Sequence, residues 1–284
     1  MKETVEQIRE RVQQAQRNYN MNTGLLEDIL LRERGYVTRI PKNEDVIVLY
    51  SGGLDSTIML DMIIKEWNVR VHPLYIRRRA RAEKHEEKAV DYFYSYFKKK
   101  YSGHLGELTK IDYEVPPKKF KKYFPKELAA TQGHPLRNST LQNLGVMYAA
   151  SLNGKYGLNI KTVLSGSVGE DSTEPELGLL SLRSQTLNTC IQLADWEWQI
   201  TSPLTDLAIR DKPVYKTELI KYAIANHIPV DKTRSCFSSS QYADGTCFAC
   251  KKRLKAFEDA GVKDPALYKH NPYKASEYKQ SKQR

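Results

Sequence analysis

The order of apolar and polar positions predicts alternating strands and helices in the central part of the chain. Residues 45–50 form an apolar, β-branched run of strand length without alternation, which is typical of a strand buried on both faces of a parallel sheet. Gly52 and Gly53 end that run. Residues 57–67 have the apolar content of a buried helix, and residues 69–76 have that of a second strand. This order predicts a β-α-β unit.

The same alternation continues further along the chain. The expected elements are helices over 81–100, 138–156 and 215–226 and strands over 108–115, 161–165 and 198–201. Such alternation favours an α/β fold in which helices cover both faces of a parallel sheet, with right-handed crossovers.

The two ends of the chain differ from this central part. Residues 1–44 are predicted to be a helical N-terminal extension that packs on the main domain or on a partner, and residues 45–234 form the main domain. Residues 235–268 place three cysteines in a loop before a further helix. Residues 269–284 are a polar, basic tail that we expect to be flexible.

Composition and charge restrict the class of protein. The formal net charge of +11 suits polyanionic partners, which include ATP and pyrophosphate as well as nucleic acid. A single lysine-rich run such as residues 118–122 is more often solvated surface, so nucleic acid ranks below a small-molecule substrate. No segment approaches the roughly 18 apolar residues of a membrane helix, and residues 1–17 lack the apolar core of a signal peptide. We therefore expect a cytoplasmic protein without a membrane partner.

The chemistry is concentrated in residues 51–56, which join the first strand to the first helix. In open parallel sheets, ligands bind beyond the carboxyl ends of the strands. Two glycines allow backbone N–H groups to form an anion-binding nest, and the helix amino terminus adds positive charge. The hydroxyls of Ser51, Ser56 and Thr57 are expected to donate to phosphate oxygens, and Asp55 is expected to hold Mg²⁺. The Gly-Lys-Ser/Thr ending of a Walker A loop is absent.

The string Ser-Gly-Gly-Leu-Asp-Ser resembles the signature of the PP-loop ATP pyrophosphatases, which have a Rossmann-like fold of the adenine nucleotide alpha hydrolase type. These enzymes cleave ATP between the α and β phosphates and adenylate a substrate oxygen. Between residues 45 and 264, further strings resemble the 7-cyano-7-deazaguanine synthase (QueC) family. They are Arg79-Ala80-Arg81-Ala82-Glu83, Pro135-Leu136-Arg137-Asn138, Ser165-Gly166 with Asp171, Pro203-Leu204 with Lys216, and Ser235-Cys236 with Cys247, Cys250 and Arg253.

The resemblance implies roles for individual residues. Expected ATP contacts are Ser51, Gly52, Gly53, Leu54, Asp55, Ser56, Thr57, Arg79 and Gly166. Expected catalytic residues are Asp55, Arg137 and Lys216, and expected substrate contacts are Asn138, Asp171 and Glu176. In physical terms, Arg137 at a helix start can reach a phosphate or carboxylate, Asn138 can cap that helix, and Lys216 can neutralise the leaving pyrophosphate.

The terminal cysteines resemble the family's zinc module with one ligand missing. Cys247-x-x-Cys250 is a typical zinc knuckle, and Cys236 supplies a third thiolate. Either Asp244 or a histidine from elsewhere completes the site, or zinc has been lost. Cys190, on a helical run, is expected to be a core residue rather than a nucleophile.

These features predict an ATP- and Mg²⁺-dependent ligase that adenylates the carboxylate of 7-carboxy-7-deazaguanine. The family converts that carboxylate to an amide and then to a nitrile. Here Arg77, Arg78 and Ala80 replace the family's Gly-Gln and His, which favours an amide product. QueC-like relatives in antiphage systems join the activated carboxylate to an amine of a partner protein, and residues 1–44 can dock such an acceptor. A homodimer is a further expectation.

Three alternatives stay open at this point. The first is an ordinary nitrile-forming synthase of deazapurine biosynthesis. The second is a tRNA-modifying thiolase, although sulfur transfer usually needs a cysteine pair near the loop and only Cys190 lies outside the terminal cluster. The third is a nucleotide sensor without turnover, against which the presence of both Asp55 and Lys216 argues.

Overall fold

The computed structural model describes residues 19–124, 134–172 and 174–269, together with residues 4, 6, 7 and 10. Most of the predicted extension before residue 19, and the tail from residue 270 onward, therefore lie outside the described residues. Within the described residues, every helix is too short or too polar to span a membrane.

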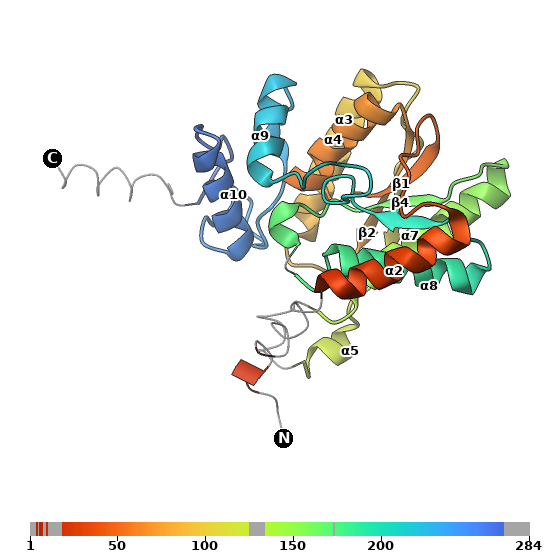
Figure 1. Ribbon diagram of the computed structural model, residues 1–284. Coiled ribbons are helices and arrows are strands. Elements are labelled where there is room, and N and C mark those ends of the chain that lie inside the picture. The colour runs from red at the N-terminus through yellow and green to blue at the C-terminus, as the bar shows by residue number, and fades with distance from the viewer. Residues whose placement is uncertain are drawn as a thin grey trace.

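Five parallel strands form one sheet in the order β3-β2-β1-β4-β5 (Figure 1). The strands are β1 (Asp45–Leu49), β2 (Arg70–Arg77), β3 (Thr109–Asp112), β4 (Thr162–Leu164) and β5 (Gln199–Thr201). Ile47 of β1 lies opposite His72 of β2 on one side and Val163 of β4 on the other. The strand order reverses direction between β1 and β4, and this switch point is where a crevice opens in α/β sheets.

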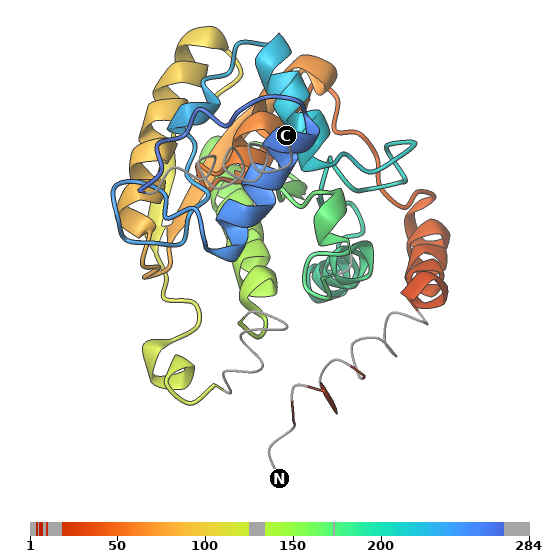
Figure 2. The same ribbon diagram turned by 90° about the vertical axis from the view of Figure 1, so that its left-hand side faces the viewer.

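Helices cover both faces of the sheet, as predicted (Figures 1 and 2). On one face pack α3 (Leu54–Trp67), α4 (Glu83–Lys100) and α9 (Lys216–Ala225), with α10 (Phe248–Asp259) beside α9. On the other face pack α7 (Arg137–Tyr156) and α8 (Leu179–Leu193). The short α5 (Lys118–Lys121) and the turns η1 (Gly169–Asp171) and η2 (Val230–Lys232) lie in connections.

The unbroken apolar run of β1 serves both faces. Val46 and Val48 belong to the core cluster under α3 and α4, whereas Ile47 belongs to the cluster under α7 and α8. All three side chains are fully buried. A strand in the centre of a sheet with two covered faces needs no polar alternation, which explains the pattern seen in the sequence.

The predicted boundaries differ from the observed ones at element ends. The strand expected over 108–115 is confined to Thr109–Asp112, and the helix expected over 138–156 begins at Arg137. Asn138 was expected to cap that helix, but Leu136 occupies the N-cap position and no side chain caps it. Asn138 is thereby left available for another role.

The N-terminal extension contains α2 (Tyr19–Arg34), which packs along α8 (Figure 1). The fully buried guanidinium of Arg183 on α8 donates to Glu27 of α2 and to both oxygens of Asp206. Tyr19 Oη accepts a hydrogen bond from the N–H of Leu180, at the start of α8. The described part of the extension is thus bound to the main domain through a buried polar network.

Candidate active site

A pocket of about 220 Å³ opens beyond the carboxyl ends of β1 and β4, at the switch point of the sheet. It lies between the loop after β1, the loop after β4 and the first turns of α7. Its lining residues are Leu49, Ser51, Gly53, Asp55, Ser56, Arg78, Asn138, Leu141, Gln142, Ser165, Gly166, Ser167, Asp171 and Leu177. Seven of the fourteen residues predicted to contact ATP or substrate or to act in catalysis line this cavity: Ser51, Gly53, Asp55, Ser56, Asn138, Gly166 and Asp171.

The loop after β1 has the backbone geometry of an anion site. Gly52 adopts a φ of 67°, and a Cβ at this position would lie 2.8 Å from the backbone nitrogen of Val90. Any other residue would be strained and would clash with α4, so glycine is required here. Gly53 then caps α3, whose first turn points its N–H groups toward the pocket. Ser51 Oγ lies 3.0 Å from Ser56 Oγ, which brings two hydroxyls to the same wall.

A second glycine lets the two loops touch. A Cβ on Gly166 would lie 3.1 Å from both the backbone nitrogen and the Cα of Ser56. The loop after β4 can therefore approach the start of α3 only with glycine at residue 166. The loop after β1 and the predicted Gly166 are neighbours, although 109 residues lie between Ser56 and Gly166 along the chain.

Asp55 forms an ion pair with Lys216, the first residue of α9. The two residues lie 161 positions apart in the sequence. Burial lowers the pKa of Lys216, but the carboxylates of Asp55 and Asp171 raise it more, so that the pKa lies above its ordinary value and the amine is protonated. Only Asp55 Oδ2 takes part in this pair. Asp55 Oδ1 is buried and has no hydrogen-bond partner.

Mg²⁺ fits this part of the pocket. The unpartnered Asp55 Oδ1 and the carboxylate of Asp171 are oxygen ligands of the kind that Mg²⁺ prefers, and both residues line the pocket. Asp171 also contacts Lys252 of α10, with 3.4 Å between Asp171 Oδ1 and Lys252 Nζ. Two lysines and two carboxylates thus surround the space next to the loop after β1.

The opposite wall is built by the start of α7. Arg137 donates to Glu176 with 2.8 Å between Arg137 Nη2 and Glu176 Oε1, and its Nε is buried without a partner, so its expected catalytic role stays a prediction. Burial raises the pKa of Glu176, and the charge of Arg137 opposes that rise only in part. Asn138 lines the pocket, and its Nδ2 is buried without a partner.

The structure does not bring every predicted residue to the pocket. Arg79 is exposed and does not line it; its neighbour Arg78 does, and pairs with Glu86. Thr57 is fully buried and does not line the pocket, and its Oγ1 has no hydrogen-bond partner, so its expected phosphate contact stays a prediction. Leu54 likewise buries its side chain and offers only its backbone at the start of α3.

Sequence reasoning also missed several pocket residues. Leu141, Gln142 and Leu177 line the cavity but were not singled out. Gln142 lies four residues after Asn138, which is the spacing of one helix face and could have indicated it. Leu177 follows a loop of irregular structure, for which the sequence carries no periodic signal.

A second pocket, of about 370 Å³, lies between α4 and the cysteine-containing segment. Its most buried cation, Arg253, is fully engaged by Asp264, Thr233 and the carbonyl of Val230. None of the buried unpartnered side-chain atoms found among the described residues belongs to the lining of this second pocket. The first pocket is therefore the candidate active site, since its polar groups still lack partners.

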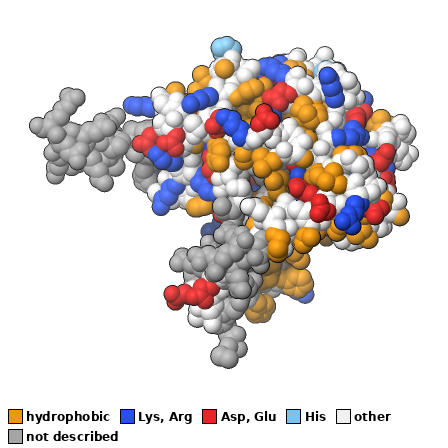
Figure 3. Space-filling model, in the orientation of Figure 1, with side chains coloured by type: hydrophobic (Ala, Val, Ile, Leu, Met, Phe, Trp, Pro, Cys, Tyr) orange, Lys and Arg blue, Asp and Glu red, His pale blue; other side chains and the backbone are white. Residues whose placement is uncertain are grey.

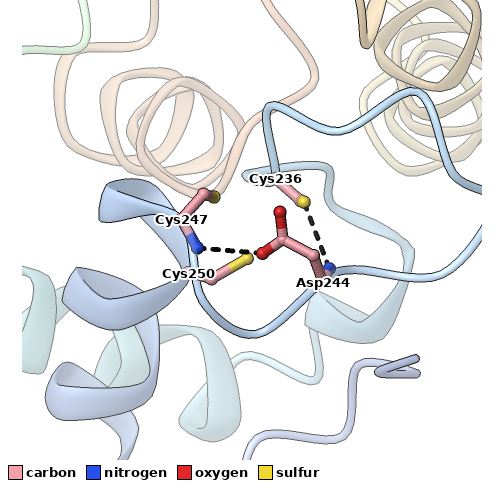
Figure 4. A group of neighbouring side chains, drawn as sticks. All are labelled: Cys236, Asp244, Cys247 and Cys250. Carbon is pink, nitrogen blue, oxygen red and sulfur yellow. Dashed lines mark hydrogen bonds between the residues drawn. The ribbon is translucent and has the colours of Figure 1, made fainter. Parts of the chain in front are cut away.

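Three cysteines and one aspartate form a cluster beside α10 (Figure 4). One ligand atom from each of Cys236, Asp244, Cys247 and Cys250 lies within 4.8 Å of the others. Asp244 Oδ1 accepts hydrogen bonds from the N–H groups of Thr246 and Cys247, at 2.8 and 2.9 Å, and the thiols are free. In the described parts of the chain, no histidine joins this cluster.

These four residues fit a structural metal such as zinc. Four ligands at this spacing match the tetrahedral preference of Zn²⁺, and Asp244 stands where the fourth thiolate was missing. The N–H groups of Ser238 and Asp244 point at Cys236 Sγ, at 3.4 and 3.3 Å, an arrangement that stabilises a thiolate. When bound, the ion would join the loop 236–247 to the start of α10.

We expect purified protein to contain about one zinc per chain and Cys247→Ser to lose it, because a structural site needs all four ligands. Elemental analysis measures the metal, and the thermal midpoint should fall because the loop around the cluster has few apolar contacts. Asp244→Ala should weaken metal retention against a chelator, whereas Cys190→Ala should leave the metal content unchanged. Zinc-free protein that melts at the same temperature with and without added zinc would contradict this assignment.

Cys190 is a core residue, as predicted. It is fully buried on α8, and its thiol contacts the carbonyl of Trp198. Burial raises the pKa of this thiol, which disfavours the reactive thiolate.

Comparison with a family model and with individual relatives points to the same family. The family model described as "Queuosine biosynthesis protein QueC" matches residues 45–261. The 7-cyano-7-deazaguanine synthase of a Nitratiruptor species is 27% identical over 232 residues, which cover 78% of this chain and 98% of that protein. The 7-cyano-7-deazaguanine synthase of Thermoplasma acidophilum is 29% identical over 238 residues, covering 81% of this chain and 94% of that protein.

Similarity to solved structures is more distant. NMN synthetase from Francisella tularensis aligns over 93% of this chain and 95% of its own, with a TM-score of 0.42 and 13% identity. The U34-tRNA thiolase NcsA from Methanococcus maripaludis aligns over 84% of this chain and 74% of its own, with a TM-score of 0.40 and 13% identity. Similarity at this level does not bear on function.

Proposed function

Since this chain belongs to the QueC family, we propose that it is an ATP-dependent ligase that adenylates the carboxylate of 7-carboxy-7-deazaguanine and passes the acyl group to an amine. The observation that carries the proposal is the pocket itself. The loop after β1 offers an anion site with Asp55, and the α7 wall facing it holds polar groups without partners. One side therefore suits the phosphates of ATP and the other suits a polar heterocycle.

In the first step, a carboxylate oxygen of the substrate attacks the α-phosphorus of ATP. The bond from the α-phosphorus to the bridging oxygen breaks, and pyrophosphate leaves. Lys216 and the amide groups of the loop after β1 stabilise the charge on the phosphates, and Mg²⁺ held by Asp55 and Asp171 would add to this neutralisation.

In the second step, the nitrogen of an amine attacks the acyl carbon, AMP leaves, and the nitrogen loses a proton. That proton passes to water, since no histidine among the described residues lines the pocket. The product of this sequence is an amide, formed with one ATP.

An amide rather than a nitrile is favoured by the residues after β2. A nitrile requires the pocket to accept the amide again and spend a second ATP. Ala80 stands where the family string has histidine, and Arg77 and Arg78 are held by Glu87 and Glu86. Without an imidazole at residue 80, the dehydration of the amide lacks the base that the family string offers, whereas amide formation needs no second ATP.

A protein is the acceptor that we favour. The described part of the extension exposes Met21, Leu25 and Ile29 at a spacing of four residues, so that they form one apolar stripe on α2. Figure 3 shows the α2 face of the molecule with hydrophobic side chains among both basic and acidic ones. This mixed face suits a protein better than a nucleic acid, which calls for a continuous basic surface.

The product assay tests the proposal. We expect ATP, Mg²⁺ and 7-carboxy-7-deazaguanine to release pyrophosphate, and an amine acceptor to give an amide at one ATP per turnover. Mass spectrometry distinguishes the acyl adenylate, the amide, the nitrile and a protein adduct. Efficient nitrile formation with ammonium at two ATP per turnover would instead favour an ordinary 7-cyano-7-deazaguanine synthase. Absence of any substrate-dependent pyrophosphate would overturn the adenylation proposal.

The positions of the four cysteines argue against the thiolase alternative. Cys190 is buried on α8, and the other three cysteines of the chain form the cluster beside α10. None of the four lines the pocket at the loop after β1. Sulfur transfer would need a thiol there.

A further inference from the structure

The α7 wall of the pocket contains buried polar atoms that no protein group satisfies. Asn138, Gln142 and Ser165 line the cavity, and their Nδ2, Oε1 and Oγ atoms are buried without a hydrogen-bond partner. Arg137 Nε and Glu176 Oε2, at the edge of the same wall, are also unpartnered. Folded proteins rarely leave such groups unpaired, because each loses its hydrogen bonds to water. Their convergence on one cavity indicates that a ligand supplies the missing partners.

Gln142 is the most buried of these residues. Only 2% of its surface is exposed, and it lies one helical turn after Asn138 on the face of α7 that borders the pocket. Its amide oxygen is an acceptor, so a ligand must offer an N–H or O–H group. Asn138 Nδ2 is a donor and needs an acceptor on the ligand. The two side chains therefore require a ligand edge that carries both kinds of group.

Apolar side chains complete this part of the pocket. Leu49 at the end of β1, Leu141 on α7 and Leu177 before α8 line the same cavity. A planar heterocycle can place its faces against such side chains and its polar edge against Asn138 and Gln142. A second unpartnered acceptor, Glu176 Oε2, lies beside this wall, where Glu176 pairs with Arg137 at the start of α7. Two acceptors favour a guanine-type edge, which has two N–H donors, over an adenine edge, which has one amino group.

We propose that Gln142 determines specificity by accepting a hydrogen bond from the exocyclic 2-amino group of a guanine-type base, while Asn138 donates to a ring acceptor. The assignment rests on the proposed function, since it places the base of the acyl substrate on α7 and the phosphates of ATP on the loop after β1. Gln142 then distinguishes substrates by their 2-amino group. Replacing Gln142 is expected to leave the affinity for ATP unchanged.

A cycle that changes one group on the protein and one on the substrate tests this contact. The substrates are 7-carboxy-7-deazaguanine and the analogue without the 2-amino group, and the variant is Gln142→Met, which keeps the side-chain length. Calorimetric binding and the KM for pyrophosphate release are measured for each pair. Wild-type protein should prefer the amino compound by about 10- to 100-fold, because a buried acceptor left unpaired costs about that much. The variant should lose the preference while the KM for ATP stays the same.

Gln185→Met is the matched control, because Gln185 is also buried but pairs with Asn143 outside the pocket. It should keep the preference for the amino compound. Wild-type protein that binds both compounds equally would overturn the assignment, even if Gln142→Met fails to fold, and so would a folded variant that keeps the full preference. Wild-type protein that binds neither compound would overturn the proposed function together with this assignment.

Discussion

Replacing Asp55 with alanine is expected to reduce pyrophosphate release by at least two to three orders of magnitude, a loss typical of removing a charged group from a site of phosphate chemistry. The carboxylate is the group that faces both Lys216 and the pocket, and its Oδ1 has no partner within the protein. Its loss would remove an oxygen ligand for Mg²⁺ and the partner that fixes the Lys216 amine.

The fold should survive this change. Lys216 is buried, but Asp171 and Glu170 also favour its charged form, so removal of Asp55 does not leave it uncompensated. A coupled pyrophosphate assay and a thermal melt separate the two effects. Asp259→Ala on α10 is a suitable control, because that carboxylate belongs to an exposed ion pair with Lys255 and should alter neither measurement appreciably. Near-wild-type pyrophosphate release from Asp55→Ala would remove Asp55 from the mechanism.

The second large effect is expected at Asp206, which holds the buried Arg183. Asp206→Ala should lower the free energy of unfolding by about 3–5 kcal/mol, because it leaves a buried guanidinium without its main counter-charge. Both side chains are fully buried, and Asp206 also accepts a hydrogen bond from the hydroxyl of Thr201. Urea unfolding followed by circular dichroism measures the loss.

Glu27→Gln is the matched comparison, because Glu27 is partly exposed and contacts the same guanidinium from α2. Its loss should cost clearly less than that of Asp206. The double variant Arg183→Met with Asp206→Leu should recover much of the stability, since no charge is then buried. Equal costs for Asp206→Ala and Glu27→Gln would show that this network does not depend on the buried pair.

The same pair predicts a pH dependence. Burial raises the pKa of Asp206, but the hydrogen bonds and charge of Arg183 lower it by a larger amount. The pKa of Asp206 therefore lies below its ordinary value. The pair therefore contributes its full stability above the pKa of an unfolded aspartate, about 3.9. That contribution is lost as the pH falls through the lower folded-state pKa, so the difference between wild type and Asp206→Ala should shrink in strong acid.

The sequence by itself determined the fold class and the position of the glycine-containing loop after β1. The unbroken run of β1 requires a strand with two covered faces, and Gly52 occupies a position where only glycine fits. Both conclusions follow from local rules, since burial pattern and backbone conformation depend mainly on a residue's own neighbourhood. The order of motifs likewise indicated the family to which the chain belongs.

Only the tertiary structure decided which residues meet in the pocket. Sequence placed Arg79 at the site, whereas the turn after β2 points Arg78 into it. It expected Asn138 both to contact the substrate and to cap the helix, and it did not mention Gln142, because the direction of a polar side chain depends on what α7 packs against. Lys216 meets Asp55, and Asp244 meets three cysteines, through contacts that fold topology creates. Local sequence does not predict contacts between residues so far apart, since these contacts form only when the strands assemble into a sheet and the helices pack on it.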